Sequence, residues 1–216
     1  MDLSFYITYM PILARGAVMT IELTLVATFF GTILGVIAAL GRISGSRVVS
    51  SLAYLYTWAI RGTPLLLQLF FIYYGLPQVG IRLDPFPAAV IGMSVCAGAY
   101  IAEIVRAGIQ SIDKGQMEAA RSLGMTYFQA MLYVVLPQAY RRLIPPMGNE
   151  IIALTKDSSL VSTLAMVELL RTAKQIDAAT LRSMEAYIAA GLYYLAITTG
   201  LTVLFDHVEK RLAVYE

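Results

Sequence analysis

Several long stretches of this chain carry almost no charge, and they restrict the folds that the chain can adopt. Residues 186–205 contain no Asp, Glu, Lys or Arg, and residues 16–41 contain a single charge, Glu22. A transmembrane helix needs about 20 mostly apolar residues. The whole chain is 58% hydrophobic and 14% charged, whereas soluble domains average about 45–50% and about 25%. The sequence therefore predicts an all-α integral membrane protein.

Five segments have the length and composition of membrane spans, and we assign the whole of residues 1–216 to one transmembrane domain. The spans are expected at about 16–41, 50–80, 86–109, 138–160 and 186–206. Arg61 interrupts the second span just before Gly62 and Pro64. Proline removes a backbone donor and bends a helix, so this point is interpreted either as a gate or as a static kink. In a static kink, Arg61 reaches toward the cytoplasm or pairs with a carboxylate.

The distribution of basic residues predicts the orientation. An odd number of spans places the termini on opposite sides, and cytoplasmic loops are enriched in Lys and Arg. With the polar residues 110–128 in the cytoplasm, nine basic residues lie inside and five lie outside. The N-terminus is therefore expected outside and the C-terminus in the cytoplasm.

The inventory of reactive residues argues against several classes of protein. The chain has 16 basic and 14 acidic residues, so it lacks the strong excess of positive charge that is typical of a nucleic-acid-binding protein. One cysteine, Cys96, and one histidine, His207, argue against a metal site, and Cys96 is expected to be a buried packing residue. No lysine directly follows a glycine, so the chain lacks the Gly-Lys pair of the common phosphate-binding P-loop. If nucleotide energy is used, another polypeptide is expected to bind it. Since the chain also has no Gly-x-Ser-x-Gly elbow, and its only histidine lies at the end of the last span, it is predicted not to be an enzyme.

The polar segment 110–137 contains the signals of two short helices. Asp113 with Gln116, and Thr126 with Gln129, have the spacing of capping boxes. Gly124 is a typical helix terminator. We expect a small projection with an alanine-rich face, which another protein's groove could approach closely. The alternative is a surface hairpin that merely joins two spans.

This segment resembles the EAA loop of ABC importer permeases. The resemblance rests on Glu118-Ala119-Ala120, Gly124 four residues after Ala120, and Val134 followed by Leu136-Pro137, with valine where the pattern has isoleucine. Three further stretches are similar to the polar amino acid uptake branch, the histidine, glutamine and arginine type. They are residues 61–68, residues 99–106 continuing to 114–116, and residues 148–150 with 155–160. The similarity extends from about Gly16 to the C-terminal tail.

The resemblance implies a type I importer in the bacterial inner membrane. Two permease subunits, identical or homologous, would pair with two ABC ATPase subunits and receive an amino acid from an extracytoplasmic binding protein. Glu118, Ala119, Ala120 and Gly124 would form the ATPase-coupling segment. This chain would bind no cofactor, because ATP and Mg would be held by the ATPase.

Charged residues inside a span are candidates for the transport pathway, since each costs roughly 2.5–3.5 kcal/mol at a helix centre. Positions 149 and 156, and 150 and 157, are seven apart and share helical faces. We hypothesise that Asn149, Glu150 and Asp157 line a substrate cavity, with Glu103 opposite. A zwitterionic amino acid needs one anionic and one cationic contact. The alternative places Lys156 and Asp157 at the outer headgroup level as a solvated boundary.

An ion-coupled secondary carrier is the alternative function. In that case Glu103, Glu150 and Asp157 would be proton or sodium sites. Many carriers contain inverted repeats, and the residues from Arg61 to Gln68 have no counterpart in the second half. Dependence on an ATPase separates the two functions.

Overall fold

The computed structural model describes residues 3–213, and over this range the chain is helical without strands. The elements are α1 Leu3–Arg42, α2 Arg47–Arg61, α3 Leu65–Phe70, a π-helical turn Phe71–Gly75, a 3-10 turn Leu76–Val79, α4 Pro85–Gln110, α5 Lys114–Ser122, α6 Tyr127–Ala130, a π-helical turn Met131–Val135, α7 Leu136–Asp157, a 3-10 segment Ser158–Leu164, α8 Leu169–Thr180 and α9 Ser183–Ala213. The all-α prediction is confirmed.

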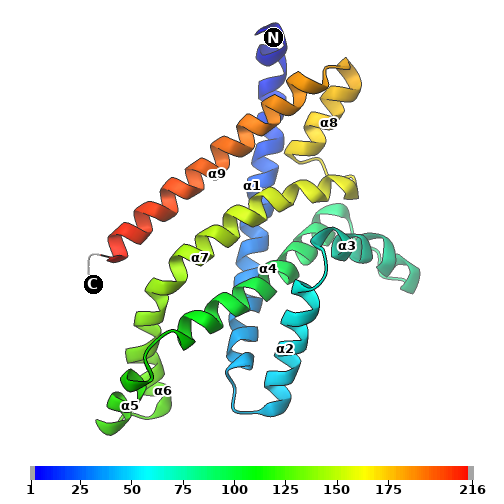
Figure 1. The fold of residues 1–216 in the computed structure, drawn as a ribbon. Coiled ribbons are helices and arrows are strands. Elements are labelled where there is room, and N and C mark those ends of the chain that lie inside the picture. The colour runs from blue at the N-terminus through cyan, green and yellow to red at the C-terminus, as the bar shows by residue number, and fades with distance from the viewer. Residues whose placement is uncertain (1–2, 214–216) are drawn as a thin grey trace.

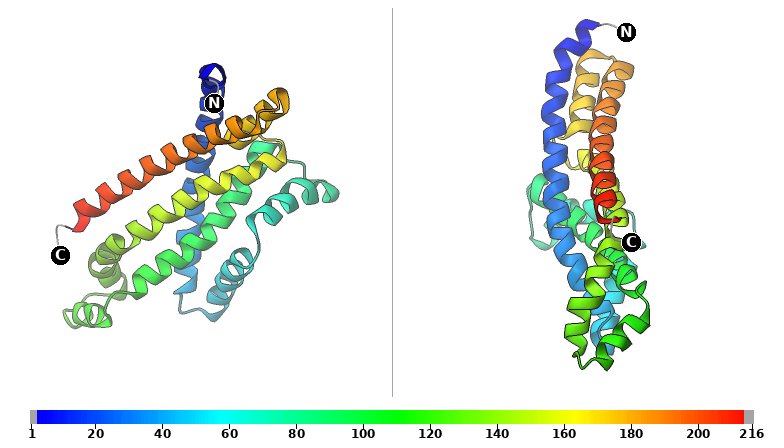
Figure 2. Two further views of the ribbon diagram at one scale, coloured as in Figure 1. Left: turned by 45° about the horizontal axis from the view of Figure 1, so that its top comes forward. Right: turned by 90° about the vertical axis from the view of Figure 1, so that its left-hand side faces the viewer.

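Three helices lie side by side and a fourth crosses them (Figures 1 and 2). The order in the layer is α4, α7, α9, and α1 packs against all three. The N-terminal end of α1 and the α5–α6 projection lie at opposite ends of the molecule (Figure 1). The α4 helix is the most enclosed of the long apolar helices, with 67% of its most apolar window buried, against 11% for α9.

Glycines allow α1 and α4 to approach each other closely. Gly31 and Gly35 are four residues apart on α1 and face Gly98 and its neighbours on α4. A Cβ atom at Gly35 would lie 2.7 Å from the Cβ of Ile101 and 3.0 Å from the carbonyl oxygen of Gly98. This is the small-residue spacing that lets membrane helices pack backbone to backbone.

Replacing Gly35 with leucine is expected to destabilise the fold strongly. Overpacking a core costs about 1–3 kcal/mol, and here the contacts include backbone atoms that have no rotamer to change. The apparent Tm of the detergent-purified protein should fall by several degrees or the yield of folded protein should collapse. The matched control is Gly191→Leu, because no atom lies within 4 Å of a Cβ built there. Equal Tm values for the two variants would contradict the close α1–α4 packing.

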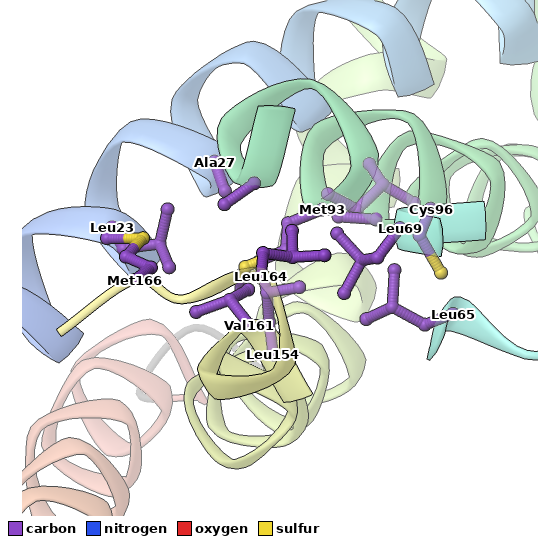
Figure 3. Packing of buried hydrophobic residues seen from close by; sticks show 13 residues of the cluster. Leu23, Ala27, Leu65, Leu69, Met93, Cys96, Leu154, Val161, Leu164 and Met166 are labelled. Atoms are coloured by element: carbon purple, nitrogen blue, oxygen red, sulfur yellow. The ribbon is translucent and has the colours of Figure 1, made fainter. Parts of the chain in front are cut away.

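The main core forms where α1, α3, α4 and the end of α7 meet (Figure 3). Leu23 and Ala27 of α1 lie on one side of this cluster, and Leu154 lies below Val161 and Leu164 in the view of Figure 3. Cys96 of α4 is 8% exposed and belongs to the same cluster. Its predicted role as a buried packing residue is confirmed.

The helix bounds differ from the expected spans at two places. The first helix begins at Leu3 rather than near residue 16, because Pro11 is accommodated inside it. The second span, expected over 50–80, is two helical pieces, Arg47–Arg61 and Leu65–Val79, bent by 100°. Pro64 precedes α3 with an extended backbone and has no N–H to continue α2. The bend expected at this point is therefore a complete break.

Length and composition alone single out α1, α4 and α9 as membrane-crossing helices among the described residues, with the bent pair as a further candidate. The α7 helix contains Arg141, Arg142, Glu150, Lys156 and Asp157, so it fails a test based on apolarity. The chain is a multi-pass membrane protein. The count of five spans and the orientation of the termini stay predictions.

A buried carboxylate joins α8 and α9, beside a hydrogen bond that joins α8 to α1. Glu168 is 0% exposed, and its carboxylate accepts hydrogen bonds from the backbone N–H groups of Leu170 and Arg171 (2.7 Å each) and from the hydroxyl of Tyr194 (3.0 Å). The backbone N–H of Leu169 donates to Thr20 of α1. Glu168 thus caps α8 from within the fold.

Removing the Glu168 carboxylate is expected to lower stability. In Glu168→Ala, two backbone donors and one hydroxyl lose their acceptor, and each buried unpaired group costs about 1–3 kcal/mol. The free energy of unfolding should fall by about 3 kcal/mol, and the apparent Tm should fall with it. Glu209→Ala on the exposed end of α9 is the control and should leave Tm nearly unchanged. A Tm of Glu168→Ala equal to that of the control would show that this network does not stabilise the joint.

Candidate functional site

The projection formed by α5 and α6 has the local structure that the sequence predicts, with one difference. Thr126 and Gln129 form a complete capping box, and Gly124 has φ +86°, a left-handed conformation that ends α5. Asp113 caps α5 by accepting from the backbone N–H of Gly115 at 2.6 Å. Gln116 does not complete a second box, and its side-chain oxygen accepts from Gln138 of α7 at 3.3 Å.

The outer surface of the projection combines small, charged and apolar side chains. Glu118 and Ala119 are exposed, whereas Ala120 is 5% exposed and anchors α5. Two apolar side chains protrude beside them, Leu123 at 84% and Phe128 at 73% exposure. Exposed apolar side chains grouped beside polar ones are typical of a protein interaction site. The four predicted coupling residues thus lie together on one small element, three of them exposed.

The second helix of the projection continues without a break into α7. The α6 helix, the π-helical turn and α7 run from Tyr127 to Asp157 with no intervening loop. At 1.5 Å per residue such a helix is roughly 45 Å long. Gln138 and Arg142 fasten its lower part to the α5 segment and to the backbone oxygen of Ser111. The projection and α7 are thus parts of one continuous helical element.

The upper part of that helix carries the predicted acidic pair. Glu150 is half-buried and Asp157 is exposed. They are seven residues apart and therefore lie on one face of α7, a helix that packs against α4. Asn149 is exposed next to Glu150. The role of these three residues in a substrate cavity stays a hypothesis.

Glu103 occupies a different environment. Its Oε1 atom lies 3.1 Å from Nε of Arg42, and its Oε2 atom lies 2.7 Å from Nη2 of Arg106. The Arg42 guanidinium also lies 4.8 Å from the ring centre of Tyr54, so Glu103 ties α1 and α2 to α4. With both oxygens engaged by arginines, Glu103 is charge-compensated, unlike Glu150. Its predicted place opposite Glu150 and Asp157 stays a hypothesis.

Comparison with known proteins identifies the family of this chain. Residues 31–214 match the family described as "Binding-protein-dependent transport system inner membrane component". The chain belongs to this family. The resemblance noted from the EAA loop is thereby confirmed.

The sequences of individual relatives align with almost the whole permease. The arginine transport system permease protein ArtQ of Bacillus subtilis (strain 168) is 41% identical over 213 residues, 98% of the permease and 97% of the relative. The L-cystine transport system permease protein TcyB of the same organism is 44% identical over 209 residues, 96% and 89% of the two chains. A crystal structure of an amino acid ABC transporter with histidines matches at a TM-score of 0.93 and 41% identity. The match covers 98% of the permease and 99% of that chain.

Two features of the permease escaped sequence reasoning. The continuity of α6 with α7 was hidden because Pro137 was interpreted as the start of a new span, although proline is tolerated in the first turn of a helix. The approach of Arg61 to Tyr100, with 5.3 Å from the guanidinium carbon to the ring centre, joins residues 39 positions apart. No local pattern signals such a contact.

Proposed function

We propose that the permease is a transmembrane subunit of an ATP-driven importer for polar amino acids. The observation that carries this proposal is the unbroken helix from the exposed projection to the acidic pair. It connects a surface suited to a partner protein with charged groups suited to a polar substrate. The close relatives named for arginine and L-cystine transport support the substrate class.

The proposed coupling is mechanical. An ABC ATPase subunit receives Glu118, Ala119 and the neighbouring Leu123 in a groove, and ATP-driven closure of two such subunits moves two projections together. Because α6 continues into α7, the movement changes the position of α7 relative to α4 and so alternates access to the pathway. ATP and Mg are bound by the ATPase, and the permease itself catalyses no reaction.

The remaining partners follow from the same proposal. A second permease subunit, identical or homologous, completes the pathway, and an extracytoplasmic binding protein delivers the amino acid at the outer face. The α9 helix has a largely uncovered apolar surface, including Leu192 and Leu195 at 51% and 60% exposure. Lipid of the bacterial inner membrane, or the second subunit, would cover such a surface.

Co-purification with an ABC ATPase tests the proposal. The two proteins should form a stable complex whose ATP hydrolysis rises when a receptor loaded with an amino acid is added, in a panel covering all standard amino acids and cystine. The matched variant is Ala119→Trp, which places a large ring on the exposed face of α5 and should prevent complex formation. Gly45→Trp is the control, because Gly45 is exposed with no atom within 4 Å of a Cβ built there. If neither the wild type nor Gly45→Trp forms a complex with the ATPase, the proposal is contradicted.

A further inference from the structure

The proposed substrate residues lack a cation. Glu150, Asp157 and Glu103 are acidic and Asn149 is neutral, so they suit the ammonium group of an amino acid. An α-carboxylate needs a positive partner, because leaving a buried charge unpaired costs several kcal/mol. The structure contains a candidate for this partner near the acidic pair.

A cavity of about 520 Å³ opens between α2, α4 and α7 on the projection side of Glu150. Arg61, Tyr100, Glu103, Arg142 and Pro146 are among its lining residues. Pro146 lies one helical turn from Glu150 on α7, so the cavity ends close to Glu150, while Asp157 lies further along the helix. Its volume is within the range of small-molecule sites, about 300–1,000 Å³.

The balance of charge in this cavity is positive. Glu103 is compensated by Arg42 and Arg106. Arg61 and Arg142 form no ion pair with any residue between 3 and 213: Arg61 stacks on Tyr100, and Arg142 donates to the backbone oxygen of Ser111 at 2.6 Å. Arg61 and Arg142 therefore line the cavity without an ion pair to any carboxylate of the described residues.

Arg61 lies between the two charged regions. Arg61 and Tyr100 line the same cavity, and Glu150 lies one helical turn beyond Pro146 of its wall. The end of α2 and the break at Gly62–Pro64 hold the Arg61 backbone, and the Tyr100 ring orients the guanidinium. A guanidinium binds a carboxylate through two parallel hydrogen bonds. An amino acid with its ammonium group at Glu150 would thus have its carboxylate toward Arg61.

We infer that Arg61, oriented by Tyr100, is the cationic contact for the α-carboxylate of the transported amino acid, and that the adjoining cavity forms the inner half of its pathway. This inference rests on the proposed function and adds to it a recognition residue. Arg142, one layer further toward the projection, offers the next positive group along the pathway. The pathway then changes from acidic at Asp157 and Glu150 to basic at Arg61 and Arg142.

The test compares amino acids with their carboxamides, which keep the ammonium group and lose the carboxylate charge. Binding of L-arginine, L-argininamide, L-glutamine and L-glutaminamide is measured on the purified permease–ATPase complex without the binding protein. The wild type should prefer the acid to the amide. In Arg61→Gln the affinity for the acid should fall about 10- to 100-fold, the range for a lost charge-assisted hydrogen bond, with little change for the amide. Arg61→Lys should lose less, because it retains the charge.

The control is Arg47→Gln at the other end of α2, where the exposed side chain does not line the cavity. An equal loss of acid and amide binding in Arg61→Gln would assign Arg61 a structural role and overturn the inference. Unchanged acid binding, or a wild type that binds acid and amide equally, would overturn it as well. If the wild-type complex transports none of the standard amino acids or cystine with any receptor, the proposed function itself fails.

Discussion

Replacing Gly124 with valine is expected to abolish uptake while ATP hydrolysis continues. Gly124 has φ +86°, and a left-handed conformation costs an ordinary residue roughly 1–2 kcal/mol, with a β-branched side chain the least tolerated. The turn fixes the angle between α5 and α6, so its distortion should misalign the surface that contacts the ATPase. Uptake should fall at least about 10-fold, since 1.4 kcal/mol corresponds to a factor of ten. Both activities are measured on the same proteoliposomes.

The Gly124 experiment has an internal control. Gly124→Asn carries a side chain of similar size to valine but tolerates the left-handed conformation. No atom lies within 4 Å of a Cβ built at Gly124, so neither variant should clash or block membrane insertion. Asparagine should therefore retain most of the uptake. If valine and asparagine behave alike, the backbone conformation of this turn is not what couples the two proteins.

Neutralising Glu150 is expected to weaken transport to a similar extent. Glu150→Gln keeps the size of the side chain and removes the charge that would bind an ammonium group. Losing one charge-assisted hydrogen bond costs about 1.5–3 kcal/mol, or roughly a 10- to 100-fold weaker interaction. Asp157→Asn should act in the same direction. Uptake by complexes of equal yield is the measurement.

Assembly serves as the control for these two substitutions. Both variants should co-purify with the ATPase as well as the wild type, because neither residue lies on the α5–α6 projection. Glu209→Gln, an exposed acidic residue near the end of α9, should transport normally. Uptake by Glu150→Gln equal to that of Glu209→Gln would remove Glu150 from the substrate site.

Local sequence signals predicted the coupling projection well. The Thr126–Gln129 box and the Gly124 terminator depend on residues within one or two turns of each other, and both are present in the structure. The Asp113–Gln116 pair had the same spacing, but Gln116 instead contacts Gln138, 22 residues away. A capping pattern does not show whether a residue distant in the sequence will bind the same side chain.

Long-range contacts limited the prediction of the membrane part. Gly31 and Gly35 have a spacing that predicts close helix packing, but nothing in the sequence shows that Gly98 of α4 is on the facing helix. Glu168 caps α8 through the nearby N–H groups of Leu170 and Arg171, but its third donor, the Tyr194 hydroxyl of α9, is 26 residues away and cannot be read from the neighbours of Glu168 in the chain. Charge alone likewise placed Glu103 in the substrate site without revealing its two arginine partners.

The energy source of uptake tests the central claim most directly. Proteoliposomes containing the permease and its ATPase, supplied with loaded receptor outside, should accumulate the amino acid only when ATP is present on the ATPase side, and an uncoupler should have no effect. Liposomes with the permease alone should show no uptake. Accumulation by the permease alone that an uncoupler abolishes would contradict the account and identify an ion-coupled carrier instead.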